Sequence, residues 1–272
     1  MSGKDLRDKI AIVTGASSGI GRLTALKLAQ EGAHLSLAAR RVELLEQVAQ
    51  DIRDVGREAL VVPTDVTERD QVRKLVERTV GRWGHVDLLI ANAGAYVRSP
   101  VQELTVAEIE QSMAVNFYGA VYATLDVLPH MLARGVGHVV LVCSVGGRKG
   151  LPLDAPYVSA KFAMRGFGDV LRQELHGTGV GVSIIYPPRV DTPLIESLET
   201  PWISPKLDPE QVADAIVGAI QHRRAEVVIG FGAKMLELLA FLAPRWADWI
   251  VRVFSLEGRE SGSKRPNKPK SA

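Results

Sequence analysis

Two side chains that can move a proton stand four residues apart in the run Tyr-Val-Ser-Ala-Lys, from Tyr157 to Lys161. At this spacing both lie on one face of a helix. A phenol has an ordinary pKa near 10, and lowering it to about 7 requires roughly 4 kcal/mol of extra phenolate stabilisation. An ammonium about 4 Å away, at an effective dielectric near 20, supplies an interaction of about that size. The pair predicts Tyr157 as a general acid or base, although the spacing alone also fits an ordinary pair on a helix surface.

Two polar residues elsewhere could complete such a site. Ser144 follows the apolar run Val139 to Cys143, an expected strand, so its hydroxyl falls at the sheet edge where open α/β sheets bind ligands. There it could hold a substrate oxygen, or it could simply hydrogen-bond the next turn. Asn116 falls within an expected helix, where asparagine is a poor choice, and this hints at a specific role. Cys143 itself is expected to be a small buried apolar residue.

A glycine-rich turn follows the first apolar run and precedes the first helical segment. It reads Gly15, Ala, Ser17, Ser18, Gly19, Ile20, Gly21, with Thr14 before it. Glycines let a backbone turn tightly and approach a phosphate, and a following helix points free N–H groups at the anion. The spacing Gly-x-x-x-Gly-x-Gly departs from the Gly-x-Gly-x-x-Gly dinucleotide pattern. The turn therefore predicts a pyrophosphate site, with a tight turn that binds no ligand as the alternative.

The end of the second expected strand distinguishes between two cofactors. An acidic residue there would bond the ribose hydroxyl of NAD, whereas an arginine accommodates the 2′-phosphate of NADP. The chain has Arg40 and Arg41 at this place and no acid at the strand end. Arg40 could bind the phosphate with paired, charge-assisted hydrogen bonds, so NADP(H) is the predicted cofactor. The alternative is that both arginines are ordinary solvated residues of a first helical turn.

Taken together, these residues resemble the compact, single-domain branch of the short-chain dehydrogenase/reductases. The resemblance runs from about Asp8 to Thr192 and rests on the glycine turn, the run Ala-Asn-Ala-Gly ending at Gly94, Asn116, Ser144 and the Tyr157/Lys161 pair. It implies that Tyr157 exchanges the substrate proton, that Lys161 lowers its pKa and bonds the nicotinamide ribose, and that Ser144 positions the substrate oxygen. It also implies that Asn116 holds a water of a proton relay.

The same resemblance implies further cofactor contacts along the sheet edge. Asp65 and Val66 would contact the adenine, while Asn92, Ala93 and Gly94 would lie along the cofactor. Pro187, Val190 and Thr192 would lie near the nicotinamide. Two departures from the family pattern stand out: Pro187-Pro188-Arg189 replaces the usual Pro-Gly, and an apolar helical pair replaces the usual C-terminal ending.

The elements that must position these residues alternate between strand and helix. This alternation predicts a doubly wound parallel sheet, Rossmann-like, with helices on both faces. We expect a catalytic domain over residues 1–230, a helical extension over 231–256 and a disordered polar tail over 257–272. The expected strands are Ile10–Val13, Leu35–Ala39, Leu60–Val62, Val86–Ala91, Val139–Cys143, Val182–Tyr186 and Glu226–Ile229. The expected helices are Ile20–Gln30, Val42–Val55, Thr67–Trp83 with Thr67 as N-cap, a long stretch from a capping box at Thr105 to about Ala133, Pro156–His176 and Val212–Gln221.

Composition excludes several classes of function. The chain has 272 residues, of which 46% are hydrophobic, enough for one sizeable core. A net charge of only +2 gives no basic footprint for nucleic acid. The single cysteine, the absence of a secretory signal and the absence of a long apolar stretch predict a cytoplasmic protein without a membrane span. The scattered histidines predict no metal site.

The substrate side carries mostly apolar candidates, which predict a lipophilic carbonyl or alcohol under a lid that begins at Leu194. Each candidate could equally be ordinary core. They are Leu151, Leu153, Leu194, Ile195, Leu198 and Trp202. The extension Met235–Phe254 could pack on the body, form a subunit contact in a homo-oligomer or touch a membrane surface peripherally, and the first two are favoured.

The predicted function is an NADP(H)-dependent oxidoreductase that interconverts a ketone or aldehyde with a secondary or primary alcohol, using Ser144, Tyr157, Lys161 and Asn116. The alternative is a non-catalytic nucleotide-binding regulator on the same fold. The presence of all four residues argues against it, because a site that has lost its catalytic function does not need to keep them. An epimerase or dehydratase is disfavoured because no second substrate domain is visible.

Overall fold

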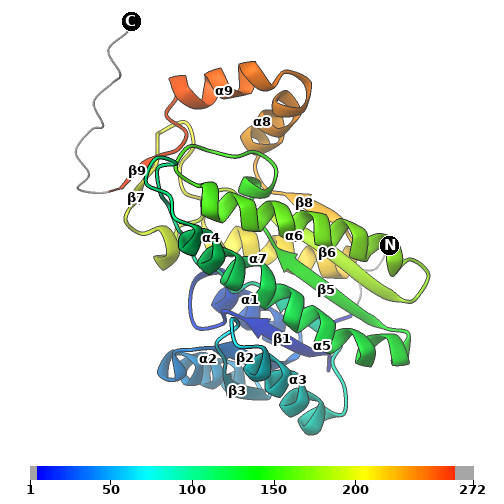
Figure 1. The fold of residues 1–272 in the computed structure, drawn as a ribbon. Helices are drawn as coiled ribbons and strands as arrows, with labels where there is room; N and C mark the ends of the chain where they lie inside the picture. Colours follow the sequence, from blue (N-terminus) through cyan, green and yellow to red (C-terminus); the bar gives the residue numbers. More distant parts are fainter. Residues whose placement is uncertain (1–4, 261–272) are drawn as a thin grey trace, which may run out of the picture.

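A sheet of seven parallel strands forms the centre of the molecule (Figure 1). The computed structural model describes residues 5–260, and the strand order is β3-β2-β1-β4-β5-β6-β8. Each neighbouring pair of strands is parallel, so the doubly wound sheet predicted from the sequence is confirmed. The strands are β1 (Ile10–Thr14), β2 (His34–Ala39), β3 (Ala59–Pro63), β4 (Leu88–Ala91), β5 (Gly137–Val142), β6 (Val180–Tyr186) and β8 (Glu226–Val228).

Helices cover both faces of the sheet and bury two separate apolar clusters. One cluster joins the sheet to α1 (Gly19–Gln30), α2 (Val42–Asp54) and α7 (Pro209–His222). The other joins it to α3 (Arg69–Trp83), α5 (Gly119–Arg134) and α6 (Ala155–Glu174). Because both faces are covered, every residue of the central strands β1 and β5 is buried, which explains their continuous apolar runs.

The chain changes its direction of travel across the sheet at β1. It first moves outward through β2 and β3, and then crosses to β4 on the other side of β1. The loops that leave the carboxyl ends of β1 and β4 therefore diverge and open a crevice between them, as in other open α/β sheets. The glycine turn after β1 packs directly against the Ala-Asn-Ala-Gly run at the end of β4.

Local signals around the helices gave one correct prediction and two errors. Thr105 and Glu108 form the predicted capping box at the start of α4 (Val106–Met113). Thr67 is not the N-cap of α3, which begins at Arg69, because its hydroxyl donates instead to Asp65. The long helix expected as far as Ala133 is interrupted by a π-helical turn over Ala114–Tyr118, between α4 and α5.

The C-terminal part departs from the expectation of a disordered tail from residue 257. Two antiparallel strands pair there, β7 (Leu198–Glu199) and β9 (Arg259–Glu260). The backbone carbonyl of Glu257 also accepts a hydrogen bond from Arg98, so residues 257–260 are held against the body. Residues 261–272 lie outside the described part of the chain. The predicted helical pair is present as α8 (Phe231–Leu242) and α9 (Pro244–Val253).

Candidate active site

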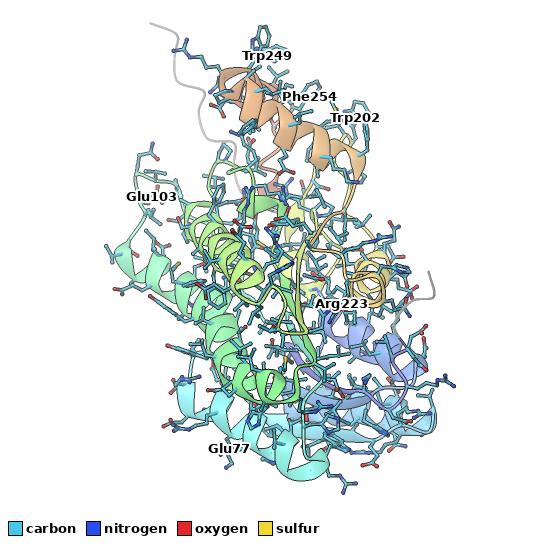
Figure 2. All side chains as sticks on the ribbon, turned by 90° about the vertical axis from the view of Figure 1, so that its right-hand side faces the viewer. Glu77, Glu103, Trp202, Arg223, Trp249 and Phe254 are labelled. Atoms are coloured by element: carbon cyan, nitrogen blue, oxygen red, sulfur yellow. The ribbon has the colours of Figure 1, made fainter. Side chains whose placement is uncertain are left out.

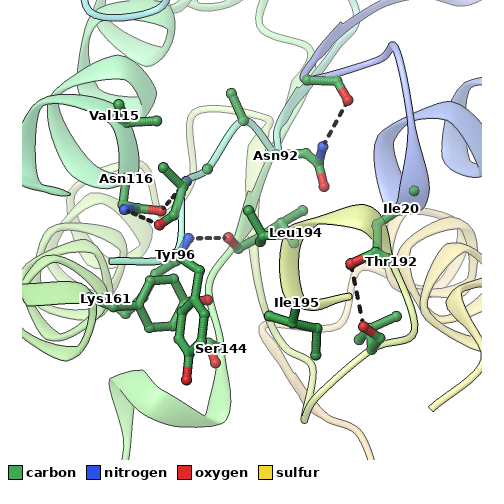
Figure 3. A pocket seen from close by; sticks show the side chains of 18 of the residues that line it. Ile20, Asn92, Tyr96, Val115, Asn116, Ser144, Lys161, Thr192, Leu194 and Ile195 are labelled. Atoms are coloured by element: carbon green, nitrogen blue, oxygen red, sulfur yellow. Dashed lines mark hydrogen bonds between the residues drawn. The ribbon is translucent and has the colours of Figure 1, made fainter. Parts of the chain in front are cut away.

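A cleft of about 720 Å³ opens at the carboxyl edge of the sheet, around the ends of β1, β4, β5 and β6 (Figure 3). With one exception, the residues proposed from the sequence for cofactor binding and proton transfer all line it. They are Gly15, Ser17, Ser18, Gly19, Ile20, Arg40, Arg41, Asp65, Val66, Asn92, Ala93, Gly94, Asn116, Ser144, Tyr157, Lys161, Pro187, Val190 and Thr192. Residues far apart in the chain therefore meet around one space.

Gly21 is the exception, because it does not line the cleft. A Cβ atom on Gly21 would lie 2.3 Å from the carbonyl oxygen of Gly15 and 2.5 Å from the side-chain nitrogen of Asn92. This glycine therefore lets α1 pack closely against the turn. Gly15 and Gly19 both adopt positive φ, at 67° and 53°, which explains glycine at these positions of the turn.

The end of β4 fixes the turn from the opposite side. The hydroxyl of Thr14 accepts hydrogen bonds from the backbone N–H groups of Asn92 and Ala93, both at 3.0 Å. The side-chain amide of Asn92 donates to the carbonyl of Thr14, also at 3.0 Å, and at 3.5 Å to the carbonyl of Gly15 (Figure 3). Asn92 therefore acts on the backbone of the turn itself.

Two arginines flank the far end of the cleft. Arg41 donates to the hydroxyls of Ser17 and Ser18, at 3.1 and 2.8 Å, and so places its charge on the glycine turn. Arg40 is 79% exposed and reaches Asp65 only at 3.9 Å. Burial opposes ionisation of Asp65, but hydrogen bonds from Thr67 hold the pKa of this carboxyl below its usual value. Arg40 thus keeps most of its hydrogen-bonding capacity available for an anion.

Tyr157 and Ser144 meet at the inner end of the cleft. Ser144 lies two residues beyond the end of β5, and its hydroxyl lies close enough to the phenol of Tyr157 to oppose the rise of the phenol's pKa. The same hydroxyl accepts a hydrogen bond from the backbone N–H of Gly146 at 3.0 Å, which fixes its position. A substrate oxygen that contacts the phenol would therefore also lie within reach of the serine.

Helical spacing suggests that the Lys161 ammonium lies beside the Tyr157 phenol, but in the structure the ammonium binds a backbone carbonyl. Its ammonium donates to the backbone carbonyl of Val142 at 3.0 Å and lies 5.6 Å from the centroid of the Tyr157 ring (Figure 3). Burial lowers the pKa of Lys161 and raises the pKa of Tyr157, while the Ser144 hydrogen bond opposes the shift of the phenol. Desolvation by burial is the largest influence on the phenol, so the pKa of Tyr157 lies above its usual value and not below it as the helical pair predicted.

Asn116 lies in the π-helical turn and is fully buried. Its amide nitrogen donates to the carbonyl of Ala95 at 2.8 Å and to Ser112, while its amide oxygen accepts from the N–H of Ala95 at 3.1 Å (Figure 3). A π turn often marks a functional position in a helix. These hydrogen bonds from Asn116 fix the backbone at Ala95 and so help to position Tyr96, the residue that follows Ala95.

Three residues of this region were not identified from the sequence: Tyr96, Arg98 and Asp154. The Tyr96 ring packs edge-on against Tyr157, with centroids 5.0 Å apart. The Tyr96 hydroxyl donates to the Asp154 carboxylate at 2.8 Å, and Arg98 donates to the same oxygen at 2.9 Å. The only sequence signals were the places of Tyr96 just after the Ala-Asn-Ala-Gly run and of Asp154 just before α6. Neither position in the sequence indicates that these side chains contact each other or Tyr157.

The substrate side of the cleft is lined by only part of the predicted apolar set. Leu151, Leu194 and Ile195 line it. Leu153, Leu198 and Trp202 do not, and Trp202 is 87% exposed. Arg189, the departure after β6, also lines the cleft, and one of its guanidinium nitrogens is buried without a hydrogen-bond partner. The substrate end is therefore apolar with one cationic group.

The geometry fits a dinucleotide with phosphates at the glycine turn. The N-terminus of α1 has no capping side chain, so its N–H groups remain available to an anion. Arg41 adds positive charge beside it, and the cleft continues without a break to Tyr157. Among residues 5–260, no three His, Cys, Asp or Glu side chains gather to hold a metal ion.

Comparison with known proteins identifies relatives over most of the chain. The sequence model of the short chain dehydrogenase family matches residues 9–201. An uncharacterized oxidoreductase of Bacillus subtilis, YxnA, is 32% identical over 98% of this chain and 77% of its own length. A fatty acyl-CoA reductase of Acinetobacter baylyi is 34% identical over 89% of this chain and 82% of its own length. An alcohol dehydrogenase from the archaeon Thermococcus sibiricus, solved with 5-hydroxy-NADP, superimposes with a TM-score of 0.75 at 28% identity, covering 82% of this chain and 96% of that one.

Proposed function

The chain belongs to the short-chain dehydrogenase/reductase family of oxidoreductases, and from this we propose that it is an NADP(H)-dependent enzyme that interconverts a lipophilic ketone or aldehyde with the corresponding alcohol. The observation that carries the proposal is the meeting of the Tyr157 phenol and the Ser144 hydroxyl at the inner end of the same cleft as the glycine turn. Acid/base groups and a phosphate site are thereby joined by one continuous space.

The chain's own residues would supply the proton and position the substrate. The bound nicotinamide would supply the hydride that adds to the carbonyl carbon. Tyr157 would give its phenolic proton to the carbonyl oxygen, and the Ser144 hydroxyl would hold that oxygen in place. With its pKa raised by burial, the phenol is protonated at neutral pH, so Tyr157 can donate a proton to the carbonyl oxygen during reduction.

The roles proposed for Lys161 and Asn116 are indirect. Lys161 lies 5.6 Å from the Tyr157 ring, and its ammonium would bond the nicotinamide ribose once that group lies beside it. Asn116 holds the segment Ala95–Tyr96 against the site, and its family role in a water relay remains a proposal. Both residues thus support the geometry around the phenol.

The preference for NADP(H) is proposed from Arg40 and Arg41. Arg41 is held against the glycine turn, while Arg40 is exposed at the cleft rim beside Asp65. The ligand named for the Thermococcus sibiricus structure is an NADP derivative, which is consistent with the same choice here. Together the two guanidiniums would bind the 2′-phosphate, which is absent from NAD.

The lipophilic substrate is proposed from the lining by Leu151, Leu194 and Ile195. The name of the Acinetobacter baylyi relative, a fatty acyl-CoA reductase, supports an aliphatic substrate. The unpaired nitrogen of Arg189 would favour a substrate that carries an additional polar or anionic group near its reactive carbon.

The proposal is tested by NADPH oxidation with a panel of long-chain aldehydes, ketones and quinones. Replacing Tyr157→Phe should lower kcat/KM by about 10²- to 10⁴-fold, the usual contribution of a positioned general acid, and leave NADPH binding intact. Tyr118→Phe, a half-exposed tyrosine outside the cleft, is the matched control and should change neither quantity. Binding of NADPH without turnover on any panel member would instead favour the non-catalytic regulator.

A further inference from the structure

Helix α8 exposes its apolar face to solvent. Its exposed positions Phe231, Met235, Leu238, Phe241 and Leu242 follow helical spacing and form one continuous stripe. Phe231 is 79% exposed and Phe241 is 84% exposed. A helix on the surface of a soluble domain normally turns such a stripe inward, and no residue of α8 is fully buried.

Helix α9 extends this apolar surface. It buries only Ala247 and Val251 and leaves Trp246, Trp249 and Val253 exposed on its outer side. The two tryptophan rings touch edge-on, with centroids 6.1 Å apart. Trp202 and Ile203, from the segment before α7, are exposed at the same end of the molecule, where Figure 2 labels Trp202 and Trp249.

The charged residues of this extension leave a net basic surface. Its two acidic residues both pair with basic residues of the body, Glu237 with Arg148 and Asp248 with Lys149. Its three basic residues, Lys234, Arg245 and Arg252, are exposed. The outward side therefore combines aromatic, aliphatic and cationic side chains with its carboxylates already neutralised.

The chain beyond this surface is also basic. The described residues end at Glu260 in β9, at the end of the molecule that carries α8 and α9 (Figure 1). The following residues, 261–272, contain four cationic side chains and no acidic one. The cationic residues are Lys264, Arg265, Lys268 and Lys270.

We propose that the outer face of α8 and α9 docks on the surface of an anionic phospholipid membrane. Exposed aromatic and aliphatic side chains beside basic ones are what an interfacial helix presents to headgroups and acyl chains. Basic residues near the lipid surface add an electrostatic attraction, and such binding usually needs both signals. No helix within residues 5–260 is long and apolar enough to cross a membrane, so the contact is peripheral.

A second copy of the chain fits this surface less well. A two-fold contact through α8 and α9 would gather the basic residues Lys234, Arg245 and Arg252 of both copies in one interface. The acidic residues that could compensate, Glu237 and Asp248, are already paired inward. An anionic lipid surface would attract these basic residues, whereas the same basic surface on a second copy would repel them. This proposal does not depend on the reaction proposed above.

The test is co-sedimentation of the full-length protein with vesicles. Wild-type protein should bind vesicles of phosphatidylcholine and phosphatidylglycerol, bind vesicles of phosphatidylcholine alone much less, and lose binding as salt rises. Replacing Phe241→Gln and Leu242→Gln together should weaken binding by at least about tenfold. Replacing the three exposed basic residues of this face, Lys234, Arg245 and Arg252, by glutamine should weaken it by about a hundredfold.

The controls separate docking from folding and from self-association. Val55→Gln and Val170→Gln remove exposed apolar groups elsewhere and should leave vesicle binding unchanged. NADPH binding by each variant verifies the fold, and light scattering gives the mass of the particle in solution. Absence of binding to anionic vesicles would overturn the proposal. So would a change of mass in the Phe241→Gln/Leu242→Gln protein with unaltered vesicle binding, since the surface would then cover another copy.

Discussion

The two halves of the cleft are held together by different kinds of contact. On the cofactor side, the turn after β1 and the end of β4 are joined by short hydrogen bonds that involve the backbone, centred on Thr14 and Asn92. On the substrate side, Arg98 joins Asp154 and the carbonyl of Glu257, which are 56 and 159 residues away along the chain. Hydrogen bonds to the backbone therefore hold the cofactor side in place, whereas the substrate side depends on the buried Arg98–Asp154 ion pair.

This difference predicts how each half fails. Steric fit limits the cofactor side, because a single added methyl group at Gly21 would meet the backbone of the turn. Charge balance limits the substrate side, because both side chains of the Arg98–Asp154 pair are only 6% exposed. Substitutions in the two halves should therefore produce distinct patterns of lost stability and altered ligand affinity.

The largest effect is expected from Asp154→Asn. This change leaves the buried Arg98 charge without its counter-ion, which should lower the free energy of unfolding by about 3–5 kcal/mol. It also weakens the acceptor for the Tyr96 hydroxyl, so Tyr96 would hold the Tyr157 ring less firmly. Guanidinium denaturation measures the first effect, and a raised KM for the carbonyl substrate with unchanged NADPH affinity measures the second.

A surface ion pair provides the control for that prediction. Asp51→Asn removes a carboxylate from its pair with Arg22, in which both side chains are about half-exposed, and should cost only about 0–1 kcal/mol. Equal losses in the two variants would show that burial of the Arg98–Asp154 pair does not set its importance. An NADPH affinity that falls along with stability would show that the two halves of the cleft are not separable.

The next effect in size is expected from Gly21→Ala on the cofactor side. Its Cβ atom would lie 2.3 Å from the Gly15 carbonyl oxygen, and this overpacking should cost about 1–3 kcal/mol of stability. The turn would have to move, so NADPH binding, measured by calorimetry, should weaken as well. Gly218→Ala is the matched control because nothing lies within 4 Å of its added methyl group, and it should stabilise α7 by about 0.5–1 kcal/mol.

A smaller and more selective effect is expected from Arg40→Ala. Loss of charge-assisted hydrogen bonds to the 2′-phosphate should weaken NADPH binding by about tenfold and leave NADH binding nearly unchanged. Arg73→Ala, an exposed arginine of α3 outside the cleft, controls for a general change of charge. Equal weakening for both cofactors would assign recognition of the 2′-phosphate elsewhere, with Arg41 as the next candidate.

Sequence reasoning found the parts of this site that depend on local spacing. The glycine turn, Ser144, and the Tyr157/Lys161 pair could be located because strand ends in a parallel sheet meet at one edge. Tyr96, Arg98 and Asp154 were missed because their contacts join distant segments that no periodicity connects. Helical spacing gave the shared face of Tyr157 and Lys161, but it could not tell that the carbonyl of Val142 would bind the ammonium.

That last difference can be tested through the pH dependence of the reaction. A phenol with a pKa near 7 would lose its proton through the neutral range, so the reduction rate would fall and the oxidation rate would rise there. The structure predicts otherwise, because burial raises the pKa of Tyr157 above its usual value near 10. The donating, protonated form is present below that raised pKa and is lost only as the pH climbs through it.

We therefore expect kcat/KM for carbonyl reduction to stay flat across neutral and mildly alkaline pH, since with NADPH saturating this quantity reports on the groups of the enzyme before the aldehyde binds. Steady-state rates with saturating NADPH and a limiting aldehyde can be compared with the same profile for Ser144→Ala. The serine hydrogen bond opposes the upward shift, so its removal should move the alkaline limb to still higher pH. A profile that instead bends near pH 7, as helical spacing alone suggested, would mean that Lys161 controls the phenol after all and that its bond to Val142 is not the arrangement that reacts.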